Sequence, residues 1–378
     1  MNRALIVIAC LVLSGSVAAQ DRPRARDLGV PFEGTPGPLN AITDVAGVEI
    51  GVTTLIAGDS VRTGVTAVLP RGRASNDPVF AGWFSLNGNG EMTGTTWIEE
   101  AGFLEGPVLI TNTHSVGVVR DAAIEWSVKQ GRQLQPWSLP IVAETWDGRL
   151  NDINGFHVKP EHVFAALDGA RGGRVAEGNV GGGTGMVCYG FKCGNGTSSR
   201  VLPDASGGYT VGVFVQANHG AQRLLRVAGV PVGAELATPP AGAQDDGGPD
   251  APSKSIIIVV ATDAPLVPHQ LKRLARRASL GLARSGSISA DSSGDIFIAF
   301  STANPGAAAA PATAQVSMLS NQRISAVFEA VVQATDEAII NALVAAETMT
   351  GYQGNTVRAL PHDRLRDLLR KYGRLQAP

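Results

Sequence analysis

The stretch Ser255-Ile-Ile-Ile-Val-Val-Ala-Thr262 decides how the rest of this chain is interpreted. An uninterrupted apolar run of this length, rich in β-branched residues, predicts a strand that is buried on both faces. The run starts abruptly on a hydroxyl residue, directly after a loose polar stretch at residues 238–254. Such a start suggests a chain that is cut before Ser255, although by itself the local pattern is more often an ordinary strand after an ordinary loop.

A cut before Ser255 would give that serine a free α-amine. An α-amine has an unperturbed pKa of about 7.7–8.0, so it can act as a base near neutral pH. One residue would then supply both the nucleophile and its base, which is the arrangement of N-terminal-nucleophile hydrolases.

The composition is that of a globular protein. Of the 378 residues, 44% are hydrophobic and 17% are charged, and the formal net charge is −2. This balance argues against disorder and gives no electrostatic reason to expect nucleic acid as a partner.

The N-terminus has the pattern of a secretory signal peptide. Arg3 supplies the positive charge, residues 4–13 are apolar, and Val17-Ala-Ala19 forms a small-residue cleavage site before Gln20. No later segment reaches about 18 uninterrupted apolar residues. We therefore expect residues 1–19 to be removed and the mature protein to be soluble, in the periplasm or secreted, without a membrane partner.

Cys188 and Cys193 remain in that mature chain. Export would permit their oxidation. The sequence does not show whether the two Cβ vectors allow a bridge, so a disulfide and free buried thiols both stay open.

Strands and long helices alternate along the chain, which favours a layered α+β or α/β domain. One helix is predicted around Leu271–Leu282, with a basic face that we interpret as a solvated surface. A second is predicted over residues 324–347, with Gly351 as its stop. The apolar runs that predict further buried strands are residues 108–111, 139–144, 210–216 and 296–300.

Several common catalytic signatures are missing. The chain has no Gly-x-Ser-x-Gly motif, and its six histidines show no His-Glu-x-x-His spacing. The glycine-rich run at residues 181–185 is not followed by Lys-Ser/Thr, so it predicts a tight turn where backbone approaches backbone, with its amides as a less favoured lining of the active site. We expect neither a metal nor an organic cofactor.

Polar residues gather at the ends of three predicted strands, at residues 144–148, 216–220 and 292–295. Strand ends are places where polar groups converge on a site. Taken singly, each of these segments is more often an ordinary turn.

With these segments in view, the chain resembles the L-aminopeptidase/D-esterase-amidase family, the DmpA-type serine aminopeptidases, which include the β-peptidyl aminopeptidases. The resemblance runs in the family order across nearly all of the mature chain. The segments that carry it are residues 42–48, 111–118, 150–155, 177–186, 216–220, 261–265, 268–273 and 346–351.

The resemblance implies an α+β fold, an α-β-β-α layered sandwich like that of N-terminal-nucleophile hydrolases. It also implies a precursor that cuts itself into an α chain, residues 20–254, and a β chain, residues 255–378. By the same resemblance, we expect a homo-oligomer, a tetramer of α/β pairs.

The resemblance further assigns site residues. Ser255 is implied as the nucleophile and Asn218 as the oxyanion donor, which fits a neutral amide. Ser293 and Asp295 are implied to hydrogen-bond the nucleophile and its amine. Glu144 is implied to receive the free amine of the substrate, and a carboxylate–ammonium pair explains why an exopeptidase demands a free N-terminus.

Two residues depart from the family pattern. Lys254 stands before the nucleophile where relatives carry glycine or asparagine, and its bulk is expected to slow the N→O acyl shift that starts self-cleavage. Trp146 stands where DmpA-type enzymes carry tyrosine. Tryptophan has no hydroxyl, so it is expected to narrow the substrate pocket instead.

The sequence thus predicts a self-processing serine aminopeptidase for short peptides, amides or esters with a free N-terminus. A narrow β-peptidyl aminopeptidase is the first alternative, since the chemistry is the same. An acyltransferase of the ornithine-acetyltransferase type is a second alternative, and a non-catalytic periplasmic binding protein is a third. Ser255 and the signal peptide argue against the acyltransferase, and a cut before Ser255 argues against the binding protein.

Overall fold

The computed structural model describes residues 22–131, 133–237, 255–309 and 312–377. The predicted signal peptide, Gln20 and Lys254 lie outside these residues, as does the rest of the polar stretch at 238–254.

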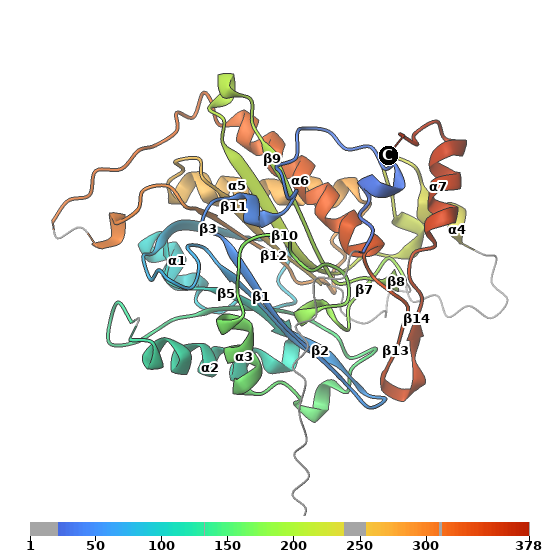
Figure 1. The fold of residues 1–378 in the computed structure, drawn as a ribbon, viewed down its shortest axis with the longest axis horizontal. Helices are drawn as coiled ribbons and strands as arrows, with labels where there is room; N and C mark the ends of the chain where they lie inside the picture. Colours follow the sequence, from blue (N-terminus) through green and yellow to red (C-terminus); the bar gives the residue numbers. More distant parts are fainter. Residues whose placement is uncertain (1–21, 132, 238–254, 310–311, 378) are drawn as a thin grey trace, which may run out of the picture.

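Two stacked sheets form the middle of the molecule (Figure 1). The six-stranded sheet has the order β4 (Phe103–Leu104), β3 (Val79–Ser85), β12 (Asp295–Ser301), β11 (Ser255–Thr262), β10 (Thr210–Asn218) and β9 (Asn195–Val201). The four-stranded sheet has the order β1 (Glu49–Ala57), β2 (Val61–Leu69), β5 (Val108–Asn112) and β6 (Ile141–Thr145).

Helices cover the outer face of each sheet. The six-stranded sheet packs against α5 (Pro268–Arg284) and α6 (Ser325–Val344), and the four-stranded sheet packs against α2 (Val116–Lys129) and α3 (Pro160–Asp168). Both sheets contain one parallel pair, β11 with β12 and β5 with β6, and a helix crosses over between the strands of each pair. The α-β-β-α sandwich expected from the family resemblance is therefore confirmed.

The alternation of side chains along β11 decides which residues face the site. Ile257 and Val259 lie in the core between the two sheets, with Ala143 of β6. Ile256 and Ile258 lie in the core beneath α5 and α6. Both faces of the strand are buried, which explains why the run is apolar without interruption. By the same alternation, the side chain of Ser255 belongs to the face between the sheets.

Smaller elements complete the described chain. Helices α1 (Thr95–Ala101), α4 (Val232–Leu236) and α7 (His362–Lys371) lie outside the two main layers. Two short hairpins pair β7 (Val187–Cys188) with β8 (Phe191–Lys192) and β13 (Met349–Thr350) with β14 (Thr356–Val357). Among the helices that the structure describes, none is both long and apolar enough to span a bilayer.

The predicted strands are all present, with small shifts at their ends. The strand expected to begin at residue 139 begins at Ile141. The second predicted helix ends at Val344, and Gly351 is not its stop. Gly351 instead lies where a Cβ would come within 2.1 Å of the Leu150 carbonyl oxygen, so close packing requires a glycine there.

The basic face of α5 is exposed or partly exposed, as expected of a solvated surface, and it also contacts neighbouring helices. Arg273 and Arg277 lie over the ring of Phe328 on α6, at 5.3 and 3.9 Å from its centroid. Lys272 pairs with Glu99 at 2.6 Å. The two guanidinium groups lie over a ring of α6 and the Lys272 ammonium pairs with a carboxylate of α1, so the basic side chains join neighbouring helices.

Cys188 and Cys193 form a disulfide, with their Cα atoms 5.4 Å apart. Of the two possibilities that the sequence left open, the structure therefore has the bridge.

Candidate active site

Asn218 and Ser255 are partners in the register of β10 and β11. One is the last residue of its strand and the other is the first. Directly opposed residues of an antiparallel pair project from the same face of the sheet. Both side chains therefore belong to the face between the two sheets, where Asn218 is 4% exposed and Ser255 is 1% exposed.

The segment before β12 holds the Ser255 hydroxyl. The Gly294 N–H donates to Ser255 Oγ at 3.1 Å. A Cβ on Gly294 would lie 2.4 Å from the Asn89 carbonyl oxygen, so the close approach of these two loops needs a glycine.

Asp295 lies beside the backbone that follows Ser255. Its Oδ1 accepts the Ile256 N–H at 3.2 Å, and the register of β11 with β12 places Asp295 opposite Ile256. Asp295 alternates with Ile296, which faces the other sheet, so its carboxylate belongs to the helix side. The carboxylate is therefore placed to interact with the backbone nitrogen of Ser255 rather than with its hydroxyl.

Burial raises the pKa of Asp295 to about 6, against hydrogen bonds from Ser289, Ser293 and the Ile256 amide that lower it. Asp295 is fully buried and Ser293 is 4% exposed. The two residues implied by the family resemblance therefore form one buried unit at the start of β12.

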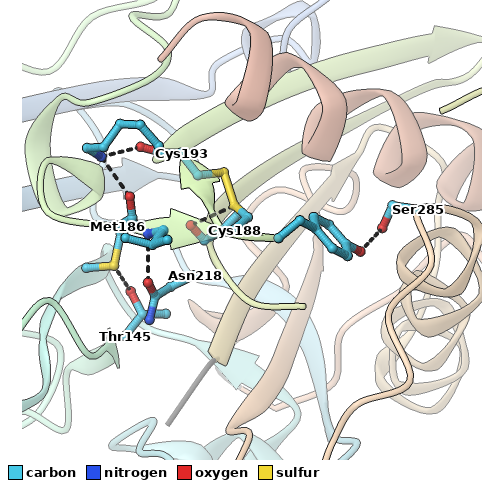
Figure 2. The surroundings of a disulfide bond; sticks show 10 residues. Thr145, Met186, Cys188, Cys193, Asn218 and Ser285 are labelled. Carbon is cyan, nitrogen blue, oxygen red and sulfur yellow. Dashed lines mark hydrogen bonds between the residues drawn. A yellow bond between two sulfur atoms is a disulfide. The ribbon is translucent and has the colours of Figure 1, made fainter. Parts of the chain in front are cut away.

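The amide of Asn218 has a defined orientation. Its Oδ1 accepts the Val187 N–H at 2.8 Å (Figure 2). Its Nδ2 donates to the Trp146 carbonyl oxygen at 2.9 Å. A primary amide carries a second N–H on Nδ2. Because Val187 occupies the oxygen, the amide presents its nitrogen and not its oxygen toward Trp146.

Glu144, on β6 of the other sheet, is 3% exposed. Its Oε1 accepts the Glu91 N–H at 3.1 Å, and its Oε2 accepts the Thr113 hydroxyl. Burial raises the pKa of Glu144, and the bond from Thr113 opposes that shift.

Gly90 separates Glu144 from the loop that holds Ser255. A Cβ on Gly90 would lie 3.1 Å from Glu144 Oε1 and 3.0 Å from Gly294 Cα. Gly90 therefore fills the space between the Glu144 carboxylate and the Gly294 backbone.

A buried glutamine joins the sheets next to this site. Gln216 Nε2 donates to the Thr111 carbonyl oxygen at 3.1 Å and to Thr145 Oγ1 at 2.8 Å. Gln216 is on β10, and its two acceptors are on β5 and β6. These bonds fix the strand that carries Asn218 relative to the strand that carries Glu144.

Trp146 follows β6 and is half-buried. Its ring occupies the space beside Gly148, where a Cβ would come within 2.5 Å of Trp146 Cζ2. Its carbonyl oxygen holds Asn218, so its backbone and its ring have separate contacts.

The structure thus brings together all of the described residues that the sequence nominated. The glycine-rich run at 181–185 is a turn of close backbone packing, as expected. The Gly181 and Gly182 amides donate to Thr54 and Thr66, so they are not aimed at the site.

Sequence reasoning missed Thr113, Gly90, Gly294 and Val187 as members of the site. Thr113 and Gly294 lie within segments that were singled out, but nothing local to Gly90 or Val187 marks them. In the described part of the chain, no three His, Cys, Asp or Glu side chains gather as a metal site would need.

A surface pocket lies elsewhere, at the N-terminal ends of β5 and β6. Its lining includes Pro107, Trp137 and Pro140, and it contains none of the nominated site residues.

Residues 40–357 match the description "Peptidase family S58". The chain is 55% identical to beta-peptidyl aminopeptidase BapA of Sphingosinicella microcystinivorans over 390 aligned residues, covering 98% of each chain. It is 50% identical to the protein of the same name from Sphingosinicella xenopeptidilytica, covering 97% of this chain and 96% of that one.

Solved structures agree. A Burkholderia sp. beta-aminopeptidase superposes with a TM-score of 0.87 at 50% identity, covering 94% of this chain and all of that one. The L-aminopeptidase D-Ala-esterase/amidase of Ochrobactrum anthropi, described as a variant of the Ntn hydrolase fold, superposes with a TM-score of 0.86 at 48% identity and the same coverage.

Proposed function

This chain belongs to peptidase family S58 and is a serine aminopeptidase, and from that premise we propose that it cuts itself before Ser255 and then uses Ser255 as its nucleophile. The observation that carries the proposal is the placement of Ser255 at the very start of β11, opposite Asn218 and beside Asp295.

Self-cleavage follows from the chemistry of a serine that follows a peptide bond. The Ser255 hydroxyl attacks the carbonyl carbon of Lys254, and the C–N bond breaks as the acyl group moves to oxygen. The nitrogen takes up the hydroxyl proton and becomes the free α-amine of Ser255. Water then hydrolyses the ester, which yields the Lys254 carboxylate and regenerates the Ser255 hydroxyl. The products are an α chain of residues 20–254 and a β chain of residues 255–378.

In the mature enzyme, the new α-amine takes the proton from Ser255 Oγ as the oxygen attacks the scissile carbonyl. The carboxylate of Asp295 lies at the Ile256 amide, next to the position of that amine. A carboxylate there would orient the amine. It would also stabilise the ammonium that exists after the amine has taken the proton from Ser255 Oγ. The leaving amine of the substrate then receives the proton, and water releases the acyl group from the serine.

Asn218 serves as the oxyanion donor in this proposal. Its Nδ2 is already oriented by Trp146 and Val187, so a second N–H is available without rearrangement. Preorganised donors of this kind stabilise a tetrahedral oxyanion more than the ground-state carbonyl.

Glu144 receives the substrate ammonium. Glu144 is a buried carboxylate whose two hydrogen-bond donors in the described structure, the Thr113 hydroxyl and the Glu91 amide, are neutral, so it gains most from a cationic partner. The ammonium also explains specificity, because an acylated N-terminus would leave this carboxylate unpaired.

We propose short peptides with an N-terminal β-amino acid as the preferred substrates. Two relatives at 55% and 50% identity, covering nearly the whole chain, are named beta-peptidyl aminopeptidases. Amides and esters of α-amino acids are the second candidate class, favoured by the 48% identity to the L-aminopeptidase D-Ala-esterase/amidase. The relatives do not support an acyltransferase.

The N-terminal pattern at residues 1–19 supports export to the periplasm with removal of that segment, which we propose together with assembly into a homo-oligomer of α/β pairs.

Intact mass measurement of the purified wild-type protein and of Ser255→Ala tests the proposal. We expect two chains with a boundary between Lys254 and Ser255 in the wild type, and one inactive chain in the variant. Ser127→Ala, which removes a hydroxyl bonded within α2, is the matched control and should be cut and active. A fully active wild type with an uncut chain would refute the mechanism.

Hydrolysis of β-alanyl and L-alanyl p-nitroanilides by the same preparations tests the substrate class. We expect the larger kcat/KM for the β-alanyl compound. A preference for the L-alanyl compound would exclude the β-peptidyl assignment and leave the self-cleaving mechanism untouched.

A further inference from the structure

We propose that the Cys188–Cys193 disulfide positions Asn218 for catalysis, so that opening the disulfide lowers the turnover rate and not only the stability of the fold. The inference rests on the proposed role of Asn218 as the oxyanion donor.

The disulfide closes a very short hairpin. Strands β7 and β8 have two residues each, and the turn between them consists of Tyr189 and Gly190. Both turn residues have positive φ, at +50° and +75°, as a two-residue turn of type I′ demands. Tyrosine is rarely found in that conformation, which persists only where the surroundings enforce it.

The hairpin touches the end of β10 at two successive residues. The Val187 N–H donates to Asn218 Oδ1 at 2.8 Å, and the Tyr189 N–H donates to the His219 carbonyl oxygen at 2.8 Å. The disulfide lies directly against this strand, with Cys188 Sγ 3.3 Å from the Ala217 carbonyl oxygen (Figure 2). The hairpin therefore orients the Asn218 amide at its oxygen, while the Trp146 carbonyl holds its nitrogen.

That orientation decides the chemistry. With Oδ1 held by Val187, the nitrogen of the amide is the group presented toward Trp146 and the site. If the hairpin moves away, the amide loses one of its two anchors and keeps the bond to the Trp146 carbonyl. An amide that then rotates presents its oxygen, which would repel a developing oxyanion.

Burial of Lys192 favours opening of the hairpin. Lys192 is fully buried, and its Nζ donates to the Met186 carbonyl oxygen at 2.7 Å and to the Cys193 carbonyl oxygen at 2.6 Å. Burial lowers the pKa of Lys192 well below its usual value. Because hydration of an amine is favourable, an opened hairpin would release Lys192 to water, and the covalent bridge opposes that opening.

On the far side of the hairpin, Tyr189 Oη and Ser285 Oγ form a hydrogen bond at 2.7 Å (Figure 2). This bond joins the hairpin to the end of α5 and makes no contact with Asn218. Its removal therefore provides a matched control, which takes one hydrogen bond from the hairpin and leaves the disulfide and the Val187–Asn218 bond in place.

The test is the double variant Cys188→Ala/Cys193→Ala, assayed per active serine after titration with a sulfonyl fluoride. We expect kcat to fall by about tenfold or more, part of the 10²–10³-fold effect of a lost oxyanion donor, with KM changed by less than about twofold. Ser285→Ala should lower Tm and leave kcat unchanged.

A double-mutant cycle distinguishes positioning from stabilisation. In an Asn218→Ala background, the two cysteine substitutions should cause no further loss of kcat, because the group that they position is already gone. A loss of kcat that is equally large in both backgrounds would overturn the proposal. So would an unchanged kcat accompanied only by a lower Tm.

A variant that leaves both sulfurs in place covers the case in which the cysteine variant fails to fold. Val187→Pro removes the N–H that Asn218 accepts and should produce the same fall in kcat; a wild-type kcat in this variant would overturn the proposal. If Asn218→Ala alone leaves kcat unchanged, the proposed function of Asn218 fails, whatever the disulfide does.

Reduction of the wild type gives the same comparison without a mutation. A dithiol supplies two electrons and two protons to the Cys188–Cys193 bond, which becomes two thiols while the dithiol closes into its own disulfide. Protein in which alkylation confirms two thiols should show the same fall in kcat, and full activity in that reduced protein would overturn the proposal.

Discussion

Asn218 lies directly opposite Ser255 across the β10–β11 pair, at the point where one strand ends and the other begins. A shift of that register by one residue would turn one of the two side chains to the opposite face of the sheet. The juxtaposition of the amide and the hydroxyl is therefore a property of strand pairing, and the core on both sides of β11 holds it in place.

Replacement of Asn218 by alanine should lower kcat by about 10²–10³-fold, the usual result of losing one preorganised oxyanion donor. The measurement is steady-state hydrolysis of an aminoacyl p-nitroanilide by processed enzyme. Asn321→Ala, which removes an exposed amide in the turn before α6, is the control. A change confined to KM would identify Asn218 as a binding residue instead.

Replacement of Glu144 by glutamine should weaken binding of substrates with a charged N-terminus by about 1.5–3 kcal/mol, the range for hydrogen bonds to charged groups. Glutamine retains an acceptor for the Glu91 amide or the Thr113 hydroxyl, so the fold around it is expected to survive. KM and inhibition by free amino-acid amides report the change. Efficient hydrolysis of an N-acetylated peptide by the wild type would contradict this role.

The uncut precursor should reveal the raised pKa of Asp295. Its folded pKa of about 6 exceeds the ordinary value of about 3.9, so the unfolded chain ionises first as pH rises. As the pH rises from about 4 to about 6, the ionisation of Asp295 should therefore lower the free energy of unfolding by about 2–3 kcal/mol, at 1.36 kcal/mol per pKa unit.

The comparison uses Asp295→Asn in the Ser255→Ala background, which keeps the chain intact. Because asparagine does not ionise, the stability of this variant relative to its parent should rise by that amount across the same pH window, measured by urea unfolding. Asp363→Asn, on the exposed face of α7, is the control. A difference that is flat with pH would show that Asp295 is not held in a desolvated position.

Trp146 should limit the size of the N-terminal side chain that the enzyme accepts. Trp146→Ala should widen acceptance by roughly 1–3 kcal/mol of discrimination per methylene-sized change, and Trp146→Tyr should place a hydroxyl in the pocket with little change in volume. A panel of α- and β-aminoacyl p-nitroanilides measures both effects. Unchanged specificity in both variants would mean that only the Trp146 carbonyl, which holds Asn218, serves the site.

Much of the fold could be predicted from local patterns. The apolar run after Ser255 became β11, and the polar ends at Asn218, Asp295 and Glu144 became strand ends in the structure. The helix that follows β11 in the sequence, α5, was predicted from the spacing of its apolar residues. These features depend on residues near in sequence, whose period matches a strand or a helix.

The segments around Gly90 and Val187 could not be predicted in the same way. Gly90 is functional only because the loop before α1 passes between Glu144 and Gly294. Val187 matters only because a hairpin thirty-one positions before Asn218 returns to its side chain. Neither residue type carries a chemical signal of its own.

The sequence by itself pointed to the candidate site residues, through the family resemblance of their segments, and to the approximate positions of the strands, because residue types and local periodicity are properties of the chain. The tertiary structure alone decided which face Asp295 takes, how the Asn218 amide is oriented, and that Cys188 pairs with Cys193. Those outcomes depend on how two sheets pack and which distant backbone groups meet, and no local spacing encodes contacts of that range.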